Sequence, residues 1–394
     1  MSRMPGLVTE PPASSGSTAL VVDLFSGAGG WMEGLAGLGW AAVGVEWDRD
    51  SCATSRAAGH TVITADVTTV DPGDWRTVWG PVGGLVASPP CQGISRAGLR
   101  TGIADVPRLV AAVARGGGHR YADERSELML VPLRWVADLW PEWVALEQVP
   151  DALPVWNAYA RRLRADGYHA WAGILCAADY GVPQTRRRAF MLASRVRVVE
   201  PPVPSHYDPR RGPALWGTPW VSMAAALGLG GTLHTNRGQR PDGTRQTAPA
   251  DEPAPAVGTK DGHRWQLRLN TRAHAAAVDE PASTVSVGPR LDRVTWEPAV
   301  DRMPRWAYAR PGTTVQADPR IGRPGHKDRE HGEPMFSADA VRVELWQLGV
   351  LQGFPQGYPW QGTRTSIATQ IGNAVPPPLA AVACRAASGD QKCA

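Results

Sequence analysis

The stretch ALVVDLFSGAGGWMEGLAGLG, residues 19–39, decides the fold of this chain. Its apolar start predicts a buried strand, SGAGG predicts a tight turn, and WMEGLAGLG predicts a helix. A strand, a glycine-rich turn and a helix in this order are typical of sheets that bind ligands at the carboxyl ends of their strands. The glycine spacing differs from the GxGxxG of dinucleotide-binding proteins, so the turn alone is a weak signal.

The same alternation of short apolar runs and amphipathic stretches continues to about residue 194. The runs that predict strands are ALVVDLF, AAVGVEW, HTVITADV, GGLVAS, WVALEQV, HAWAGILC and RAFMLAS. Strands that alternate with helical segments indicate a parallel sheet with helices on both faces. We therefore predict an α/β fold built on an open, mostly parallel sheet.

The chain divides into regions of different composition. Residues 1–18 are expected to form a flexible lead-in, and residues 19–200 a domain that holds the predicted sheet. Residues 201–334 are rich in Pro, Gly, Thr and Arg, which predicts a smaller domain of short strands and loops. In 335–388, the stretch SADAVRVELWQLGVLQGF predicts a helix with Ser337 as its N-cap, and a second helix follows GNAVPPP. We expect these helices to rejoin the first domain, with a tail at 389–394.

Composition excludes several classes of protein. The five cysteines are odd in number, widely spaced and free of any CxxC pattern, which argues against disulfides and zinc, so we predict no metal. We find no apolar run of the roughly 20 residues that would cross a bilayer and no signal peptide, so we expect an intracellular protein. Residues 201–334 alone carry a net charge of +4, as large as that of the whole chain. This excess of basic residues fits a surface that binds a polyanion and a solvated basic face equally well.

Acidic side chains follow three successive predicted strands. Asp23 lies beside Phe25 in the first, Glu46 precedes Trp47 in the second, and Asp66 ends the third. A carboxylate can accept the hydroxyls of a ribose, and an indole can cover an adenine. Each residue alone could equally be a cap or turn residue. Together they favour a nucleoside cofactor without a phosphate cradle, and hence S-adenosylmethionine over NAD.

Cys91 lies in SPPCQGIS, directly after the apolar run GGLVA. A thiol on a proline-braced loop at a strand end is a candidate nucleophile, although a lone cysteine is more often a core residue. In WVALEQV, Glu147 ends another strand, where burial would keep its carboxyl group protonated as a proton donor; a helix cap is the alternative. Gln184, Arg186 and Arg188 alternate in an extended run and so share one face, either lining a cleft or forming a solvated basic edge.

Taken in order, DLFSGAGG, EWD, ADV, SPPCQGIS, DERSEL, LEQV, DYGVPQTRRR and GNAVPPP resemble the successive motifs of the DNA cytosine-5 methyltransferase family. The resemblance spans most of residues 20–200 and 337–385, and its order and spacing are highly specific. It implies a Rossmann-like S-adenosylmethionine-dependent methyltransferase fold with a target-recognition domain at 201–334. The residues implied at the cofactor are Asp23, Phe25, Ser26, Gly27, Gly29, Gly30, Glu46, Trp47, Asp66, Val67, Pro90, Leu128, Asn373 and Ala374.

The same resemblance implies the chemistry. Cys91 would attack C6 of a flipped cytosine, Glu147 would protonate N3, and Arg186 and Arg188 would flank the base, with Arg188 nearest O2. Double-stranded DNA would be the partner of a monomeric, cytoplasmic protein of bacterial or phage origin, associated with the nucleoid. A restriction endonuclease would be a separate chain. The residues implied at DNA are Gln92, Ser95, Arg96, Arg100, Gln184, Thr284 and Thr314.

Two features modify the resemblance. The arginine-rich run after Cys91, with glycines at 116–118, matches the family's mobile catalytic loop but is long enough to be an insertion instead. The chain also has Glu147-Gln148-Val149 where the family usually has Glu-Asn-Val, which affects the expected rate more than the reaction type. The alternatives are an RNA (tRNA) cytosine-5 methyltransferase and a catalytically silent DNA-binding regulator. The target sequence is not readable from these residues.

Overall fold

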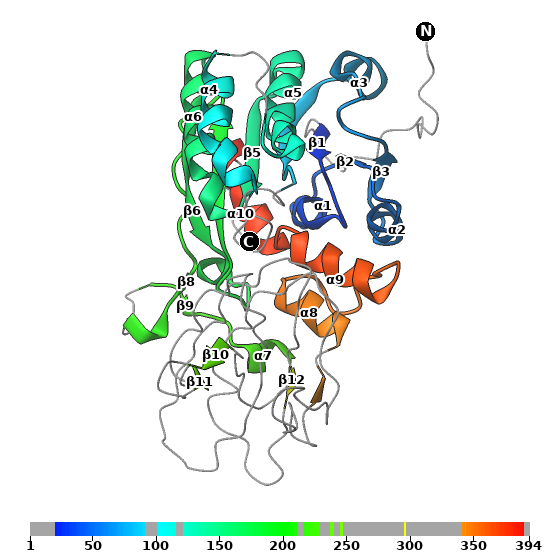
Figure 1. The fold of residues 1–394 in the computed structure, drawn as a ribbon, viewed down its shortest axis with the longest axis vertical. Coiled ribbons are helices and arrows are strands. Elements are labelled where there is room, and N and C mark those ends of the chain that lie inside the picture. The colour runs from blue at the N-terminus through cyan, green and yellow to red at the C-terminus, as the bar shows by residue number, and fades with distance from the viewer. Residues whose placement is uncertain are drawn as a thin grey trace.

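A computed structural model of the chain describes residues 20–90, 101–115, 121–211, 216–227, 237–239, 245–246, 295–296, 341–342 and 344–389. A seven-stranded sheet lies at its centre, in the order β3-β2-β1-β4-β5-β7-β6 (Figure 1). The strands are β1 (Leu20–Leu24), β2 (Ala42–Glu46), β3 (Thr61–Thr64), β4 (Val82–Ala87), β5 (Trp143–Gln148), β6 (His169–Cys176) and β7 (Arg187–Ser194).

The sheet is mixed but mostly parallel. The first five strands in spatial order, from β3 to β5, pair in parallel, whereas β7 is antiparallel to both of its neighbours, β5 and β6. Each strand overlaps one of the apolar runs that predicted it, so the predicted fold class is confirmed. The parallel strands end at one edge, which gathers the residues that follow them.

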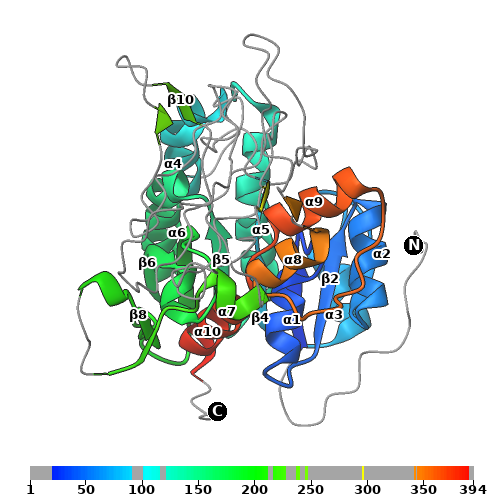
Figure 2. The same cartoon turned by 90° about the horizontal axis from the view of Figure 1, so that it is seen from below.

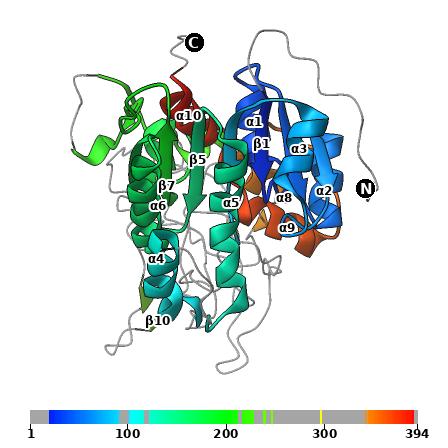
Figure 3. The ribbon, with the colours of Figure 1, turned by 90° about the horizontal axis from the view of Figure 1, so that it is seen from above.

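Helices cover both faces because alternate strand residues point to opposite sides. On one face, Val22 and Leu24 pack with α3 (Pro72–Trp79), α4 (Val106–Arg115), α5 (Val131–Leu139) and α6 (Leu153–Ala165). On the other, Val21 packs with α1 (Gly30–Ala36) and α10 (Pro377–Ser388). Figures 2 and 3 show these helices around the sheet, and α2 (Arg49–Ala57) packs against β3 at one end of it.

The C-terminal segment returns to the sheet. It contains α8 (Leu345–Leu351), α9 (Arg364–Asn373) and α10, which packs against α1, β5 and β7. Thr54 of α2 donates a hydrogen bond to Gln370 of α9 at 2.6 Å. The helix predicted after GNAVPPP is therefore present, in contact with the N-terminal elements.

The predicted start of α8 was wrong. Ser337 lies outside the described residues, and the described residues 341–342 form β13 (Val341–Arg342), which pairs with β12 (Thr295–Trp296). The helix begins only at Leu345, where Glu344 and Gln347 form a capping box. The alternation in VRV favours a strand, and the capping box fixes the helix start later in the chain.

Between residues 201 and 246, the described α-helices and strands are short. They are β8 (His206–Tyr207), β9 (Thr218–Pro219), α7 (Met223–Leu227), β10 (Arg237–Gln239) and β11 (Arg245–Gln246). The boundaries of the two domains and of the terminal segments stay predictions. No helix in the described part of the chain is both long enough and apolar enough to cross a membrane.

Candidate active site

A cleft of about 910 Å³ opens where the carboxyl ends of β1, β2, β4 and β5 face the turn between α9 and α10. Its volume is at the upper end of the range typical of small-molecule sites. Glu46 and Trp47 line one part of the wall, and Glu147, Arg186 and Arg188 line another. One continuous cavity therefore joins the residues predicted to bind a cofactor to those predicted to act on a base.

The glycine-rich turn after β1 needs glycine for two different reasons. Gly27 and Gly29 have φ angles of 55° and 94°, a backbone conformation that side chains disfavour. Gly30 starts α1 against the α9–α10 turn, where an added Cβ would lie 2.3 Å from the carbonyl oxygen of Val375. The turn can therefore approach the C-terminal segment only without a side chain at residue 30.

Glu46 is held at the end of β2 by three backbone N–H groups. Its Oε2 accepts from Gly27 at 2.8 Å, and its Oε1 accepts from Trp47 at 2.9 Å and Asp48 at 2.8 Å. Burial raises the pKa of this carboxyl group, and the three hydrogen bonds oppose that rise. The indole of Trp47 is 76% exposed beside it, a high value for so large an apolar side chain. Glu46 is thus fixed, and Trp47 is free to cover a ligand.

Asp23 lies in β1, before the glycine-rich turn, and is not among the residues that line the cleft. It is fully buried, and neither carboxyl oxygen has a hydrogen-bond partner. Burial raises its pKa well above the usual value, and the charge of nearby Glu46 adds to the rise. Such a site favours the neutral acid, because an isolated charge is costly to bury.

The turn after β3 carries Asp66 and Val67 and is held from both sides. Asp66 accepts hydrogen bonds from the backbone N–H and the hydroxyl of Thr68, at 2.9 and 2.7 Å. From α5, the guanidinium of Arg134 donates to the carbonyl oxygens of Val67, Thr68 and Val70, at 3.0 to 3.2 Å. Arg134 therefore fixes a turn that forms one wall of the cleft.

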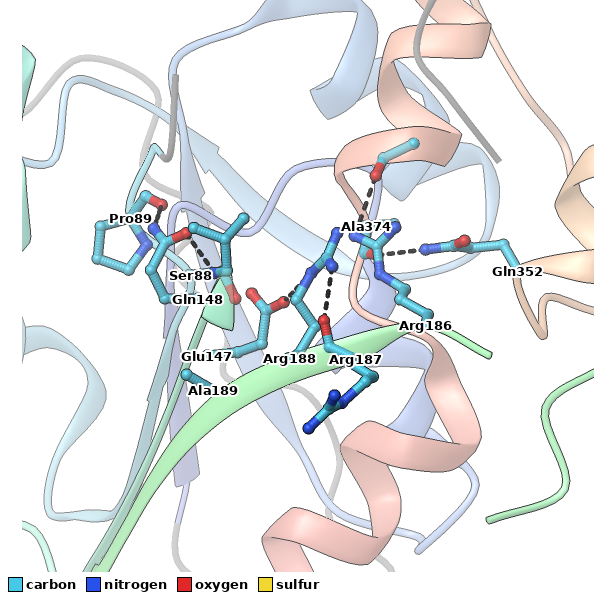
Figure 4. A network of polar contacts seen from close by, with 12 residues as sticks. Ser88, Pro89, Glu147, Gln148, Arg186, Arg187, Arg188, Ala189, Gln352 and Ala374 are labelled. Carbon is cyan, nitrogen blue, oxygen red and sulfur yellow. Dashed lines mark hydrogen bonds and ion pairs between the residues drawn. The ribbon is translucent and has the colours of Figure 1, made fainter. Parts of the chain in front are cut away.

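Glu147 and Arg188 form a buried ion pair between β5 and β7. Arg188 Nε lies 3.0 Å from Glu147 Oε1, and the two side chains are 8% and 6% exposed (Figure 4). Arg188 also donates from Nη1 to the carbonyl oxygen of Arg187 at 2.8 Å. Both ends of the pair line the cleft, so the carboxyl and guanidinium groups are available to a ligand in fixed positions.

Arg186 and Gln184 lie next along the same extended segment, and both are buried. Arg186 donates to the carbonyl oxygen of Gly372 at 3.0 Å. Gln184 donates to the carbonyl oxygen of Leu351 and to the side chain of Gln352, each at 3.0 Å. These hydrogen bonds tie the segment to the C-terminal helices. Gln184 was predicted to contact DNA, whereas here its side chain is buried and bonds to Leu351 and Gln352.

The cleft brings together most residues predicted for it. Those predicted at the cofactor that line the cleft are Phe25, Ser26, Gly27, Gly30, Glu46, Trp47, Asp66, Val67, Pro90, Leu128, Asn373 and Ala374. Gly29 is not among them; it packs where an added Cβ would lie 2.9 Å from His60. Asp23 is also set back from the wall. The roles of all these residues stay predictions.

Several predicted residues cannot be placed. Those that lie outside the described residues are Cys91, Gln92, Ser95, Arg96, Arg100, Thr284 and Thr314. Pro90, the last described residue before Cys91, lines the cleft. Among the residues that the structure does describe, no group of three or more His, Cys, Asp or Glu side chains could hold a metal ion.

Some cleft residues were missed from the sequence. Ser88 lines the cleft and accepts a hydrogen bond from the indole of Trp31 at 2.9 Å; its place in SPPCQGIS, at the end of β4, is the sequence signal for it. Ser366, Thr369 and Gln370 line the wall from α9. The sequence of α9 mixes polar and apolar residues without a clear helical face, so no periodic pattern revealed it.

The model of the family described as C-5 cytosine-specific DNA methylase matches residues 20–212. Type II methyltransferase M.DdeI of Desulfomicrobium norvegicum is 30% identical over 184 residues, which is 44% of this chain and 40% of that protein. The chain thus spans well under half the length of M.DdeI. Type II methyltransferase M.AquIA of Picosynechococcus sp. is 30% identical over 218 residues, which is 47% of this chain and 76% of that protein.

A solved structure of a DNMT2 variant from Spodoptera frugiperda is similar in fold. It superposes with a TM-score of 0.53 at 13% identity and covers 94% of this chain and 99% of that one. At this identity the likeness supports the fold alone. The family match, the coverage of M.AquIA and the ordered motifs around the cleft agree, and the chain belongs to the C-5 cytosine-specific DNA methylase family.

Proposed function

We propose that the protein is an S-adenosylmethionine-dependent, sequence-specific DNA cytosine-5 methyltransferase that acts on a cytosine flipped out of duplex DNA. The observation that carries this proposal is the single cleft that joins the fixed carboxylate of Glu46 to the Glu147–Arg188 ion pair. A cofactor and a base bound in its two parts would lie next to each other, as a transfer between them requires.

The residues present fit S-adenosylmethionine. Glu46, fixed by three N–H groups, would accept the ribose hydroxyls, and the exposed indole of Trp47 would cover the adenine. Asp66 would accept from the exocyclic amine of the adenine. When bound, the cofactor supplies the electrophilic methyl group. The chain's own residues have to bind it, orient it and prepare the base.

The base needs preparation because C5 of cytosine is a weak nucleophile. In the proposed reaction, the thiolate of Cys91 forms a bond to C6. The electron pair of the C5–C6 double bond moves into the C4–C5 bond, and the pair of the C4–N3 double bond moves onto N3, which takes the proton from Glu147 in its protonated form. The new C4–C5 double bond gives C5 its enamine character. After C5 has accepted the methyl group, N3 returns its proton to Glu147 and a base removes the C5 proton. The electron pair left behind expels the thiolate and breaks the sulfur–carbon bond.

Arg186 and Arg188 would flank the cytosine. Arg188 is held between Glu147 and the Arg187 carbonyl group, so its guanidinium cannot swing away from the cleft. It would donate toward O2 of the base, which compensates the charge that builds up on the ring during attack. The partner would be double-stranded DNA. Stacking in the duplex hides C6 of the cytosine, so the base would have to be flipped into the cleft before Cys91 can attack it.

The test is methyl transfer from radiolabelled S-adenosylmethionine to duplex DNA by the wild-type protein, Cys91→Ala and Glu147→Gln. We expect labelling of cytosine in duplex DNA by the wild type and none by Cys91→Ala. Labelling that survives in Cys91→Ala would exclude the covalent route. Bisulfite sequencing of the DNA of a cell that expresses the protein would then identify the target.

The two alternatives are outcomes of the same test. Transfer to tRNA with none to duplex DNA would make the protein an RNA cytosine-5 methyltransferase. Tight DNA binding without transfer to either would indicate a silent regulator. M.DdeI and M.AquIA are both named Type II methyltransferases, which supports a role in restriction–modification. We propose with it a cytoplasmic location, a function in phage defence and an endonuclease on a separate chain.

A further inference from the structure

Gln148 occupies the position where the family usually has asparagine, and its side chain is almost fully buried at 2% exposed. Its Nε2 donates to the carbonyl oxygen of Pro89 at 2.8 Å, and its Oε1 accepts from the backbone N–H of Val149 at 2.6 Å (Figure 4). A further contact of Nε2 reaches Met129 Sδ at 3.6 Å. Both ends of the amide are therefore in use.

The contact with Pro89 joins two strand ends that do not pair there. The β4–β5 ladder stops at Ala87 and Leu146, so beyond it the backbones of 88–90 and 147–149 are no longer tied by sheet hydrogen bonds. The hydrogen bond from the Gln148 side chain to the Pro89 carbonyl oxygen links these two stretches. Proline has no backbone N–H, so neither Pro89 nor Pro90 can donate a hydrogen bond to residues 147–149 in place of this one.

The length of the side chain matters for this link. The backbone of Gln148 is fixed in β5 by its pairing with Ala189 of β7. Pro89 lies two residues after the end of β4, the strand that pairs with β5 on its other side. An asparagine would carry the same amide on an arm about 1.5 Å shorter, the length of one carbon–carbon bond. The 2.8 Å hydrogen bond would then open beyond the range in which it contributes.

We infer that Gln148 is a positioning residue, whose amide fixes the Pro89 carbonyl group and thereby the point from which the segment bearing Cys91 leaves the sheet. Cys91 follows Pro89 by two residues, so a shift of this carbonyl changes where the thiol can approach C6. Attack requires the reacting atoms within about 3 to 3.5 Å, and small displacements slow it strongly. The inference rests on the proposed function, because it gives Cys91 that role.

The test separates attack by Cys91 from cofactor binding. DNA that contains 5-fluorocytosine traps the covalent adduct, because the fluorine on C5 cannot leave as a proton does. The rate of adduct formation is measured in a single turnover for the wild type, Gln148→Met and Gln148→Asn. Methionine keeps the length without a strong donor, and asparagine keeps the amide on a shorter arm. Binding of S-adenosylhomocysteine and the melting temperature are measured on the same proteins.

We expect both variants to form the adduct about tenfold more slowly, because each loses one buried hydrogen bond. Their affinity for S-adenosylhomocysteine should stay within about twofold of that of the wild type. The matched control is Gln347→Met, which makes the same change at a buried glutamine in the α8 capping box and should leave the adduct rate unchanged. If Gln148→Met does not fold, Gln148→Asn decides alone.

Two results would overturn the inference. One is an adduct rate equal to that of the wild type in both folded variants. The other is a loss of cofactor binding as large as the loss of rate, which would mark Gln148 as a general structural residue. A wild-type protein that forms no adduct on any cytosine-containing DNA would instead overturn the proposed function, and so the two failures are distinguishable.

Discussion

Arg188 Nε lies 3.0 Å from Glu147 Oε1, and the pair is buried between two antiparallel strands of the sheet. The strands fix both partners, so the carboxyl group that is proposed to protonate the base cannot rotate freely. Removal of either partner leaves a buried group without its counterion, which typically costs several kcal/mol of stability. This pair therefore links the stability of the protein to its proposed activity.

The first prediction separates those two effects. Glu147→Gln should lower the rate of methyl transfer about 100-fold or more, because a positioned proton donor is lost, and should also lower the melting temperature. The double variant Glu147→Gln/Arg188→Met should recover part of the melting temperature without recovering the rate. Thermal melting and single-turnover methyl transfer are the measurements. A double variant that melts no higher than Glu147→Gln would contradict the prediction.

The second prediction concerns the approach of the glycine-rich turn to the C-terminal segment. Gly30→Ala places a Cβ 2.3 Å from the Val375 carbonyl oxygen, so the backbones must separate, at a cost of about 1 to 3 kcal/mol. We expect a lower melting temperature and weaker binding of S-adenosylhomocysteine. Gly37→Ala is the control: Gly37 has an ordinary φ of −61°, and its Cβ would come no closer than 3.5 Å to the nearest atom. Equal effects at both glycines would argue against the close approach.

The third prediction is a dependence of stability on pH that comes from Asp23. Its pKa is raised in the folded protein, so the folded state holds the proton more tightly than the unfolded state does. The stabilisation is complete below the unfolded pKa, near the usual 3.8, and is lost as pH rises through the raised folded pKa. Asp23→Asn, which stays neutral, should therefore gain in melting temperature relative to the wild type as pH rises from 5 to 8.

The control for that measurement is Asp74→Asn, at an exposed position in the first turn of α3. Its difference from the wild type should change little over the same pH range. A difference between Asp23→Asn and the wild type that stays constant from pH 5 to 8 would show that Asp23 is already ionised in the folded protein over that range.

The fourth prediction concerns the turn after β3. Arg134→Met keeps most of the aliphatic stem but removes the donors to the Val67, Thr68 and Val70 carbonyl groups. We expect binding of S-adenosylhomocysteine to weaken about five- to tenfold, because Asp66 and Val67 would no longer be held in place. Isothermal titration calorimetry measures the affinity. Arg161→Met, at an exposed position on α6, should bind like the wild type.

Much of the fold was predictable because it rests on local patterns. Short apolar runs between helical stretches identify all seven strands of the central sheet, and the residues that follow them gather at one edge as parallel topology requires. The part that failed depends on distant partners. Residues 341–342 pair with 295–296 as a strand, and no local signal in the helix-like stretch after Ser337 indicates that pairing.

The candidate site divides in the same way. Glu46 and Trp47 could be found because they lie at the end of β2, and Asp66 because it follows β3. The inward bonding of Gln184, the three-carbonyl contact of Arg134 and the link from Gln148 to Pro89 could not, because each depends on which backbone atoms the fold brings within reach. An alternating pattern shows that side chains share a face; it does not show whether that face meets solvent or another helix.

The contact between Gly30 and Val375 has a consequence for biosynthesis. The two residues meet in the cleft wall although about 345 positions separate them in the sequence, and α10 covers β1 and β5 from beyond residue 376. A nascent chain that has emerged to residue 200 holds all seven strands of the central sheet, but it lacks α10 on the face that α1 covers only in part. Closing so long a loop is slow, and the uncovered part of that apolar face is exposed to aggregation meanwhile. Holdase chaperones would therefore act on this protein mainly before residues 377–388 leave the ribosome.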